Sequence, residues 1–522
     1  MKPIYLKFLA FVVAALMLLS VVSCTTVSGS LDGADTTVGN EETTAEETTT
    51  ESPDGETTET ADLTTETVDE TALSVPDDLK LNDEISILYW SDSKYTEFEI
   101  EELRADTIGD SIYWRDKQTA DLLSVTFRWT PTPGNADNME AFSSVVEASY
   151  EAGDRAYDIV ASYSKTMGLL SVKGFLADMN AIENNYLDFS KVWWPSHLVE
   201  DVSMGGAMYF LTGDVTTSAI YEMIGLHYND ALRAELQLED PRELIRAENW
   251  TLSKFMEISA GGYVDTDLDG AKSTGDTYGF WAQYSYFGQF YTGSALSTLE
   301  DDADDILTIS SDFSSPKTYQ LVLQLQEFLR NDAVMKTSTT GSGDAFAQER
   351  AIFANQRLRC MYYNRAWSEE LSHSLFFLPT PKYNSEQESY YTAVGHSVSL
   401  FGIMADASPE EQANCTAVLE TLAYFSYQST IPELERIRMC KCYEGEIYAR
   451  TYGEFLGICR RSITLDHSRI FAPFLENTNG MTQLFSASVY NETSWDDAVE
   501  IANTTIKAKL EAIRQTYRDL KQ

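Results

Sequence analysis

Runs of apolar residues at two different spacings divide the chain into strands and helices. The first run, Glu84–Trp90, alternates and then becomes continuously apolar before polar turn residues end it, which predicts a buried strand. Similar runs predict strands over 123–129 and 157–161. Apolar residues at helical spacing predict a helix over 139–152, ending at Gly153. The pattern therefore alternates strand and helix.

This alternation predicts an α/β fold. Strand–helix–strand units in one sheet are joined by right-handed crossovers, and such sheets bind ligands beyond the carboxyl ends of their strands. Three aromatic residues stand at or just after the predicted strand ends, namely Trp90, Trp129 and Tyr163. We interpret them as candidate ligand contacts; the alternative is that loops bury them.

The first 24 residues have the pattern of a secretion signal. Lys2 and Lys7 supply a positive start, and the apolar run that follows is short for a membrane span. Its ending at Cys24 resembles the lipobox of bacterial lipoprotein signal peptides. The resemblance implies that signal peptide 1–24 is processed and that Cys24 carries lipid on the extracytoplasmic face of the cell membrane. An ordinary secretory leader with an incidental cysteine is the alternative.

Residues 25–79 are predicted to form a disordered tether. From Thr25 to about Ser74 the sequence is almost entirely Thr, Glu, Asp, Ser and Gly, with no aromatic residue and no cation. Such a stretch lacks the apolar surface that offsets chain entropy, and like charges extend it. It therefore predicts a hydrated spacer between a lipid anchor and a folded domain.

Length and charge limit what the remaining residues, 80–522, can be. Their number exceeds one ordinary core and predicts two domains. The whole chain has 37 basic and 82 acidic residues and a net charge of −45, which repels phosphate backbones and excludes a nucleic-acid partner. After the leader, no apolar run is long enough to span a bilayer, and we expect a monomer.

The cysteines do not form a disulfide framework in the sequence. Those beyond Cys24 are Cys360, Cys415, Cys440, Cys442 and Cys459. Because their number is odd, most are predicted to be small buried apolar residues. A soft-metal site at Cys440-Lys441-Cys442 with Cys459 is the alternative, but no four-ligand pattern with histidine completes it.

A series of short motifs follows in order along the globular part. They are Tyr157-Asp158-Ile159-Val160, Gly174-Phe175-Leu176-Ala177-Asp178-Met179, Met208-Tyr209-Phe210-Leu211, Ile224-Gly225-Leu226-His227-Tyr228-Asn229-Asp230, Asn249-Trp250-Thr251-Leu252, Phe353-Ala354-Asn355 and Leu378-Pro379-Thr380-Pro381-Lys382. Their order and spacing resemble the family 1 extracellular solute-binding proteins of ABC importers, the carbohydrate-directed group that includes maltose-binding protein. The resemblance covers residues 82–522, and in it Thr251 is an expected helix N-cap.

The resemblance implies a two-lobed α/β fold with discontinuous lobes, hinge strands and a ligand cleft. Lobe one would comprise residues 80–217 and 390–432, and lobe two residues 218–389 and 433–522. A sugar or oligosaccharide would be held in the cleft, which would close by hinge motion. Membrane permease subunits of an ABC importer would then receive the solute.

Two ligand-binding residues carry over from the family by position. Glu222 stands seven residues before Asn229, and Trp367 stands six after Met361, as the sugar-bonding Glu and the stacking Trp do in the family. A sugar needs carboxylate partners for its hydroxyls and aromatic walls for its C–H faces. The alternatives are a solvated acid beside the hinge and a core aromatic. Trp281 is a further candidate wall.

One departure from the family follows the third predicted strand. The maltose-binding member has Trp and Asp there, whereas this chain has Ser162 and Lys165. The solute is therefore predicted not to be maltose. Lys165 would either meet an acidic sugar or cap a loop.

An acidic loop has the spacing of a calcium site. Its candidate ligands are Asp265, Asp267, Asp269, the carbonyl of Ala271, and Asp276. They match D-x-D-x-D-G-x5-[acid], in which Gly270 permits the sharp bend. The final Asp is one methylene shorter than the usual Glu, which would weaken bidentate binding. We predict structural Ca²⁺; the alternative is an acidic turn that needs no metal.

The sequence contains no recognisable catalytic motif. A nucleophile elbow, a P-loop, HExxH and a Cys–His arrangement are all absent, and the five histidines are widely separated. Paired carboxylates, which a glycosidase needs, occur throughout so acidic a chain. We therefore predict a lipid-anchored, cell-surface solute-binding subunit of an ABC importer that is not an enzyme. The alternatives are a sensory or adhesive lipoprotein of the same fold and, less favoured, a glycan-active enzyme.

Overall fold

The computed structural model describes residues 69–301, 306–337, 346, 348–363, 375–442, 446–475 and 480–520. The predicted signal peptide with Cys24, the tether up to residue 68, and Trp367 lie outside these ranges. Within the described ranges, no helix combines the length and the apolar character needed to cross a membrane. Cys415 and Cys459 are buried free thiols, as predicted, and Cys360 is a half-buried one.

The first sheet holds four strands in the order β14-β3-β1-β2. They are β1 (Glu84–Trp90), β2 (Thr126–Thr132), β3 (Ile159–Tyr163) and β14 (Ser399–Ile403). Strand β1 runs parallel to β2 and β3, with Ile87 opposite Trp129 and Ile159. Strand β14 runs antiparallel to β3. Parallel strands of this kind need the crossover helices that the sequence predicted.

Strands β2 and β3 begin later than predicted. Helix α2 (Thr107–Leu123) continues through Leu123, and Ser124 closes it in the left-handed conformation at φ 56°, so β2 cannot begin before Thr126. Trp129 therefore lies within β2 and not beyond its carboxyl end, which corrects the prediction for that residue. Tyr163 is the last residue of β3.

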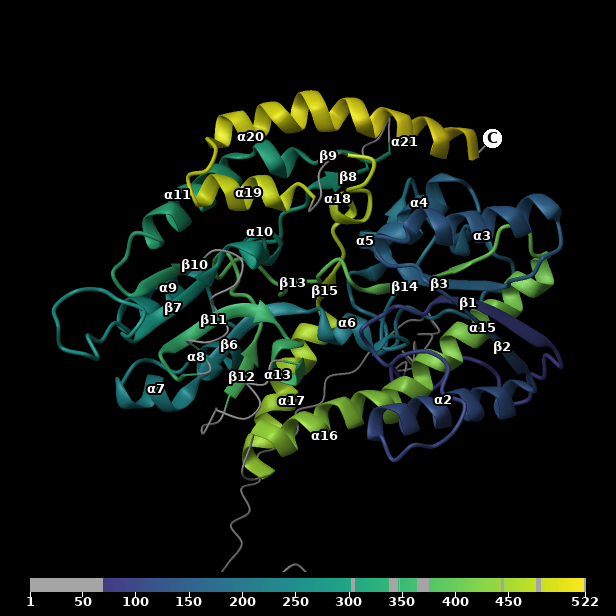
Figure 1. Ribbon diagram of the computed structural model, residues 1–522, viewed down its shortest axis with the longest axis horizontal. Coiled ribbons are helices and arrows are strands. Elements are labelled where there is room, and N and C mark those ends of the chain that lie inside the picture. The colour runs from purple at the N-terminus through teal and green to yellow at the C-terminus, as the bar shows by residue number, and fades with distance from the viewer. Residues whose placement is uncertain are drawn as a thin grey trace, which may run out of the picture. The chain divides into compact units, whose positions relative to one another are not determined.

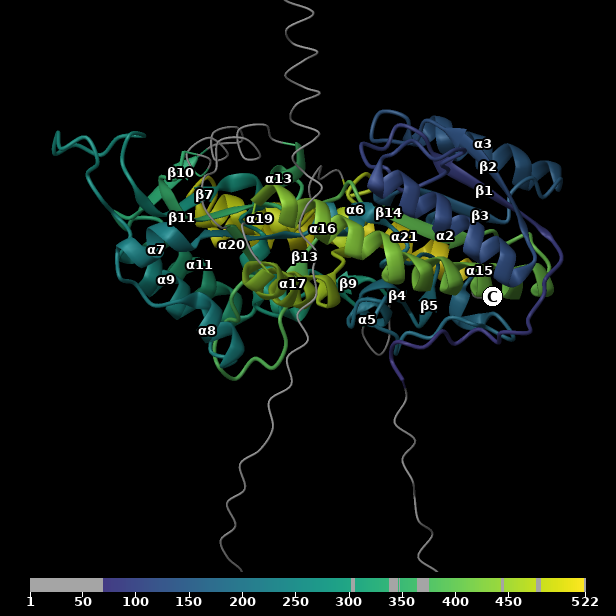
Figure 2. The same cartoon turned by 90° about the horizontal axis from the view of Figure 1, so that it is seen from below.

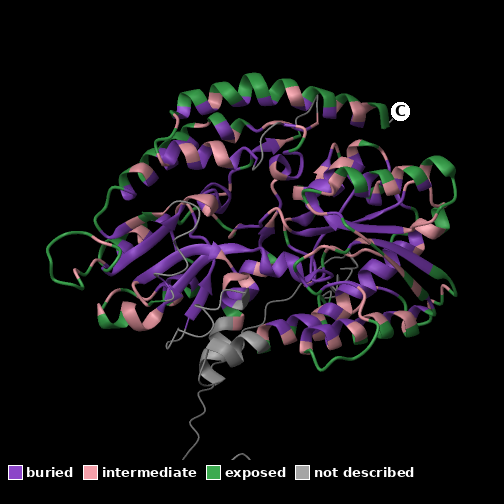
Figure 3. Cartoon of the chain, in the orientation of Figure 1, coloured by how far each residue is buried: buried purple, intermediate pink, exposed green. Residues whose placement is uncertain are grey.

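Helices cover both faces of the first sheet (Figure 1). Helices α3 (Met139–Ala152) and α4 (Ser164–Val172) pack together on one face. Helices α2 and α15 (Pro409–Phe425) lie side by side on the other, as both Figure 1 and Figure 2 show. A capping box of Ser408 and Glu411 begins α15. Between these helices, β3 is completely buried (Figure 3).

The second sheet holds five strands in the order β10-β7-β11-β6-β12. They are β6 (Ile224–Asn229), β7 (Tyr278–Gln283), β10 (Val334–Thr337), β11 (Ala351–Arg357) and β12 (Leu375–Leu378). Strand β7 is parallel to β10 and β11, and β6 is antiparallel to β11 and β12. Helices α7 (Asp230–Glu235), α9 (Leu252–Ala260) and α17 (Glu446–Arg461) pack against β11, β7 and β12 respectively. Thr251 caps α9 as predicted, accepting a hydrogen bond from the amide of Lys254.

Shorter elements and the outer helices complete the structure. They are η1 (Met179–Ala181), α5 (Leu198–Val202), β4 (Ser203–Met204), β5 (Ala207–Met208), α6 (Thr217–Tyr221), α8 (Pro241–Arg246), η2 (Tyr284–Tyr286), α10 (Gln289–Gly293), β8 (Leu299–Glu300), β9 (Thr308–Ile309), η3 (Ser311–Ser314), α11 (Pro316–Phe328), α13 (Cys360–Tyr363), β13 (Thr392–Ala393), η4 (Ser426–Thr430), α16 (Ile431–Cys442), β15 (Ile463–Thr464), α18 (His467–Ile470), α19 (Thr482–Val489), α20 (Trp495–Ile501), η5 (Ala502–Ile506) and α21 (Lys507–Leu520). We call the first sheet with its helices lobe one and the second sheet with its helices lobe two.

Two crossing segments between the lobes pair with each other. The chain leaves lobe one ahead of α6 and enters lobe two at β6, and it returns between β12 and β14. Met223 in the first crossing forms a β-bridge with Val394 in the second, and β13 pairs with β15 beside them. A short paired ribbon of this kind fits the hinge strands of the predicted fold.

The end of the predicted tether packs against lobe one. Val75 is 2% exposed, and the Ser74 hydroxyl donates to a carboxylate oxygen of Glu420 on α15 at 2.8 Å. The Lys191 ammonium donates to the backbone carbonyl of Asp69. The packed part of the chain therefore begins by Asp69 and not at residue 80, because Leu73, Val75 and Leu79 supply apolar side chains that pack on the core.

Candidate functional site

Glu222 lies at the crossing between the lobes and is completely buried. Its carboxylate forms ion pairs with Arg357 at 3.0 Å and with Arg359 at 3.4 Å, both at the end of β11. It also accepts a hydrogen bond from the hydroxyl of Tyr95, which follows β1 in lobe one. Residues from both lobes and from the crossing thus meet at one carboxylate.

Local backbone structure fixes this meeting point. Thr216 caps the short helix α6 by accepting from the amide of Ala219, and Glu222 stands at the other end of that helix. The amide of Arg359 donates to the carbonyl of Tyr221, which holds the end of β11 against the crossing. Any side chain at Gly395 would overlap the Glu222 carboxylate, so only glycine fits there.

Aromatic side chains flank this point on the lobe-one side. The rings of Trp90 and Tyr163 are 5.7 Å apart and tilted by 34°. The Trp90 indole donates to the hydroxyl of Ser399, and the Tyr163 hydroxyl lies 3.1 Å from Nδ1 of His396. Tyr95 stacks on Tyr221 with ring centroids 5.0 Å apart. Two of the predicted strand-end aromatics therefore lie together beside the second crossing.

The charges of four cations act on His396. They are Lys165, Arg357, Arg359 and Arg469, which we call the basic cluster. Burial and these four charges together lower the pKa of His396 to about 2, so its imidazole is neutral at physiological pH. Arg469 donates to the carbonyl of Val394 at 3.0 Å, and the Arg357 guanidinium lies 5.2 Å from the ring centre of Tyr286.

The structure places the other predicted ligand contacts elsewhere. Trp129 packs against Tyr89 and Phe127 at centroid distances of 5.8 and 5.9 Å. Trp281 is 3% exposed and packs against Tyr278 inside lobe two. Trp129 and Trp281 therefore belong to two other aromatic clusters. The structure instead brings Trp90 and Tyr163 close to Glu222. Trp367 lies outside the described residues.

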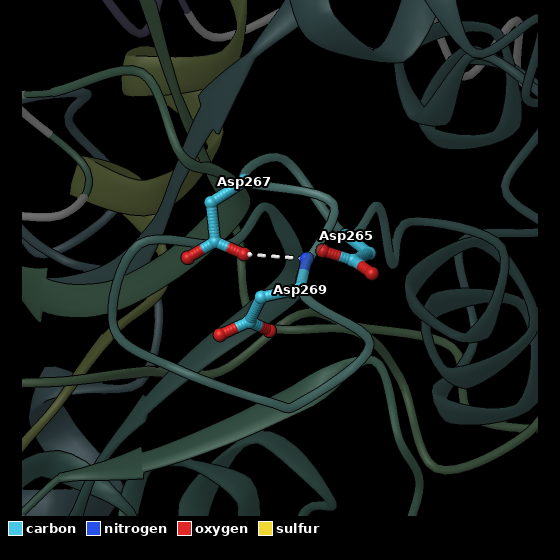
Figure 4. Close-up of side chains that lie close together, drawn as sticks. All are labelled: Asp265, Asp267 and Asp269. Atoms are coloured by element: carbon cyan, nitrogen blue, oxygen red, sulfur yellow. Dashed lines mark hydrogen bonds between the residues drawn. The ribbon is translucent and has the colours of Figure 1, made fainter.

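The predicted calcium loop brings three carboxylates together (Figure 4). Oxygens of Asp265, Asp267 and Asp269 all lie within 4.8 Å of one another. The amide of Asp269 donates to Asp267 at 3.3 Å, and the amide of Gly270, at φ +74°, donates to Asp265. The hydrogen bond from Asp269 lowers the pKa of Asp267, but desolvation and the neighbouring carboxylates outweigh it and raise that pKa overall. Mutual repulsion of this kind is what a bound cation relieves.

Asp276 occupies a different position from the other acids of this loop. It is completely buried, and its carboxylate accepts hydrogen bonds from the amides of Thr266 and Ser273. It therefore holds the two ends of the loop together. Asp265, Asp267 and Asp269 lie close enough together that they could hold a cation, whereas Asp276 acts on the backbone of the loop that carries them.

A cavity of about 280 Å³ has an acidic lining and contains none of the predicted ligand contacts. Its carboxylates are Glu200, Asp201, Glu300, Asp301 and Asp466. Burial raises the pKa of Asp201 well above its usual range. The two regions thus differ in charge: the acids gather here, and the cations gather around Glu222.

Arg357, Arg359, Arg469 and Tyr95 were not among the residues predicted from the sequence. One signal was present: Arg357-Leu358-Arg359 places two cations directly after a buried strand in a chain with few cations. Arg469 and Tyr95 gave no comparable signal, because their place depends on contacts between segments far apart in the sequence.

Comparisons with protein families and with curated proteins found no match. Solved structures do match over most of the chain. The sugar-binding protein MalE from Xanthomonas citri aligns with a TM-score of 0.51 and 12% identity, over 84% of this chain and 99% of its own. A cyclo/maltodextrin-binding protein complexed with maltotetraose aligns with a TM-score of 0.50 and 13% identity, over 81% and 97%. An uncharacterized protein from Listeria monocytogenes EGD-e aligns with a TM-score of 0.53 and 11% identity, over 82% and 99%.

At these identities the likeness shows the fold. The chain has the two-lobed α/β fold of these sugar- and maltodextrin-binding proteins, which confirms the predicted fold class. Two of the three matched proteins are binding proteins by name, and almost the whole length of all three aligns with this chain.

Proposed function

We propose that this protein is the solute-binding subunit of an ABC importer and that it captures a carbohydrate between its two lobes. The fold supports this, since the matched structures include a sugar-binding protein and a maltodextrin-binding protein. The observation that carries the proposal is the convergence of Tyr95 from lobe one and Arg359 from lobe two on Glu222, beside the Trp90–Tyr163 pair. Aromatic faces with charged and hydrogen-bonding groups at their edge are what a sugar ring requires.

The buried position of Glu222 gives it a positioning role in this proposal. Its Oε1 contacts Tyr95 and Arg359, and its Oε2 contacts Arg357. Glu222 would therefore orient these side chains toward a ligand. The paired crossings at Met223 and Val394 run directly beside it. Hinge bending at that point would change the distance between Tyr95 and Arg359, which is how closure would act on the site.

Four further parts of the proposal come from the sequence. Cys24 would carry the lipid that anchors the protein to the outer face of the cell membrane, with the Thr- and Glu-rich stretch as its tether. The membrane permease subunits of the importer would be the partner. Asp265, Asp267 and Asp269 would hold a structural Ca²⁺, and the protein would have no enzymatic activity of its own.

Carbohydrate binding by residues 25–522 tests the function directly. Isothermal titration calorimetry against neutral and acidic oligosaccharides should give saturable binding, and Trp367→Ala should weaken it at least tenfold, or about 1.5 to 3 kcal/mol, by removing a stacked wall. The matched control is Trp114→Ala, because Trp114 lies on α2 and is 52% exposed. If none of the oligosaccharides binds, the proposed function is refuted. If the Trp367→Ala and Trp114→Ala variants bind with equal affinity, the role of Trp367 is refuted.

A further inference from the structure

The basic cluster differs in charge from the rest of the molecule, which is strongly acidic. The chain has 37 basic and 82 acidic residues, yet the charges of four cations act on the imidazole of His396, and one of them, Arg469, donates to Val394, two residues before it. Glu222 lies among them and pairs with Arg357 and Arg359. Among the described carboxylates, Asp466 also acts on Arg469, and its Oδ1 accepts from Thr298. Among the described residues, four cations thus act together with two carboxylates in a strongly acidic protein.

Bringing these cations together costs free energy. Burial lowers the pKa of Lys165, and the charge of Arg469 lowers it further. Burial likewise lowers the pKa of Arg469, with Arg357 adding to the effect. Like charges that are brought together and partly removed from water repel one another, and an anion among them would relieve that repulsion. Groups arranged at such a cost are concentrated at functional sites.

The cluster also remains accessible. The Arg359 side chain is 24% exposed, and His396 is half-buried. The neutral His396 ring has one donor and one acceptor nitrogen, and its Nδ1 lies 3.1 Å from the Tyr163 hydroxyl. Arginine guanidinium groups match the planar geometry of a carboxylate and the oxygens of a sulfate.

We infer that the solute is an anionic carbohydrate and that its carboxylate or sulfate group binds within the basic cluster, beside His396. The inference rests on the proposed function and names the substrate class of the same site. The Trp90–Tyr163 pair, each residue 3% exposed, would lie behind the bound sugar, and the cations would select for the charged substituent.

Matched pairs of probes test the inference. Residues 25–522 are titrated by calorimetry with uronic acid oligosaccharides and their methyl esters, and with sulfated oligosaccharides and their unsulfated parents. Each pair differs mainly in charge. The charged member is expected to bind at least tenfold more tightly, and the pair that shows this preference distinguishes carboxylate from sulfate.

Arg359→Gln should reduce the preference to less than threefold by weakening only the charged probe. Arg330→Gln is the matched control, because it removes the same charge from a side chain that is 61% exposed and pairs with Glu327. Since Arg359 also holds Glu222, thermal melting monitors folding, and Lys165→Met repeats the test from lobe one. Retention of the full preference by both folded variants would refute the role of the cluster.

The remaining outcomes separate this inference from the proposed function. Equal binding of charged and neutral probes would overturn the inference and leave a carbohydrate-binding protein. Inorganic sulfate or acetate binding as tightly as the oligosaccharides would overturn it as well, because the sugar would then contribute nothing. No binding of any carbohydrate would overturn both.

Discussion

Glu420 is a single buried carboxylate that ties the start of the folded chain to lobe one. It accepts hydrogen bonds from the Ser74 hydroxyl at 2.8 Å, the Trp193 indole at 3.1 Å and the Trp194 indole at 2.9 Å. Burial raises its pKa to about 7, although these donors act in the opposite direction. The side chain that holds the end of the tether therefore titrates near physiological pH.

The raised pKa of Glu420 predicts that stability falls as pH rises. An acid that holds its proton more tightly in the folded state stabilises that state at low pH. The contribution is fully present below the ordinary pKa of 4.5 and is lost as pH rises through about 7, a change of about 3 kcal/mol in the free energy of unfolding.

Urea unfolding at pH 4.5 and pH 8 checks this value. The wild-type protein should lose about 3 kcal/mol more between the two conditions than Glu420→Gln, which cannot titrate. Glu410→Gln is the control, because Glu410 is exposed in the first turn of the same helix, α15. Parallel pH dependences for wild type and Glu420→Gln would show that Glu420 titrates alike in both states.

The acidic loop contains the acids that the spacing predicted, but one of them has a different role in the structure. The spacing predicted five ligands, and the structure brings Asp265, Asp267 and Asp269 within 4.8 Å of one another. It uses Asp276 to accept the amides of Thr266 and Ser273. Side-chain to backbone bonds of this kind compete with metal binding, and spacing alone cannot decide between them.

If the loop binds calcium, chelation should destabilise the folded state. Calcium at a hundredfold excess over its dissociation constant adds about 2.7 kcal/mol to the free energy of unfolding, so EDTA should lower the melting temperature. Asp267→Asn should abolish the response, whereas Asp121→Asn, an exposed acid on α2, should retain it. A melting temperature insensitive to EDTA, with no metal found by elemental analysis, would rule out the site.

The local sequence predicted helices and strands correctly where a single hydrophobic periodicity dominated the segment. The apolar run at Glu84–Trp90 became β1, and the helical spacing over 139–152 became α3 with the same bounds. The predicted start of β2 was wrong because the apolar residues Leu123 and Val125 fit a helix end and a strand equally well. Ser124 between them adopts the left-handed conformation, and nothing in the local pattern signals this.

The site was predictable only in part, for a related reason. Trp90 and Tyr163 could be found because strand ends line up at one edge of a sheet. The pairing of Glu222 with Arg357 joins residues 135 positions apart and exists only because β11 returns beside the crossing. Long-range pairs of ordinary residue types leave no local pattern in a single sequence.

Across the whole molecule, the helical segments that connect the lobes share one feature. Between α15 and α16 lies the π-helical turn η4, and between α20 and α21 lies the π-helical turn η5. The chain continues from α16 to α17, which packs on β12 in lobe two, while α21 packs on α4 in lobe one. Since π-turns bend helices and weaken their regular hydrogen bonding, both are positions at which hinge motion can be absorbed.

The C-terminal helical segment is expected to restrain that motion (Figure 1). Trp495 packs against Phe313 of lobe two at 4.9 Å, and the Tyr517 hydroxyl bonds to Ser171 of lobe one at 2.8 Å. Tyr517→Ala should detach α21, raising amide hydrogen exchange in α21 and α4 while β1 and β3 stay protected. The ligand-free radius of gyration from X-ray scattering should rise.

The control is Tyr319→Ala, at a tyrosine that is 45% exposed on α11. Faster exchange spread evenly over both sheets would mean that Tyr517 stabilises the whole fold, and exchange and scattering equal to the control would mean that α21 restrains nothing.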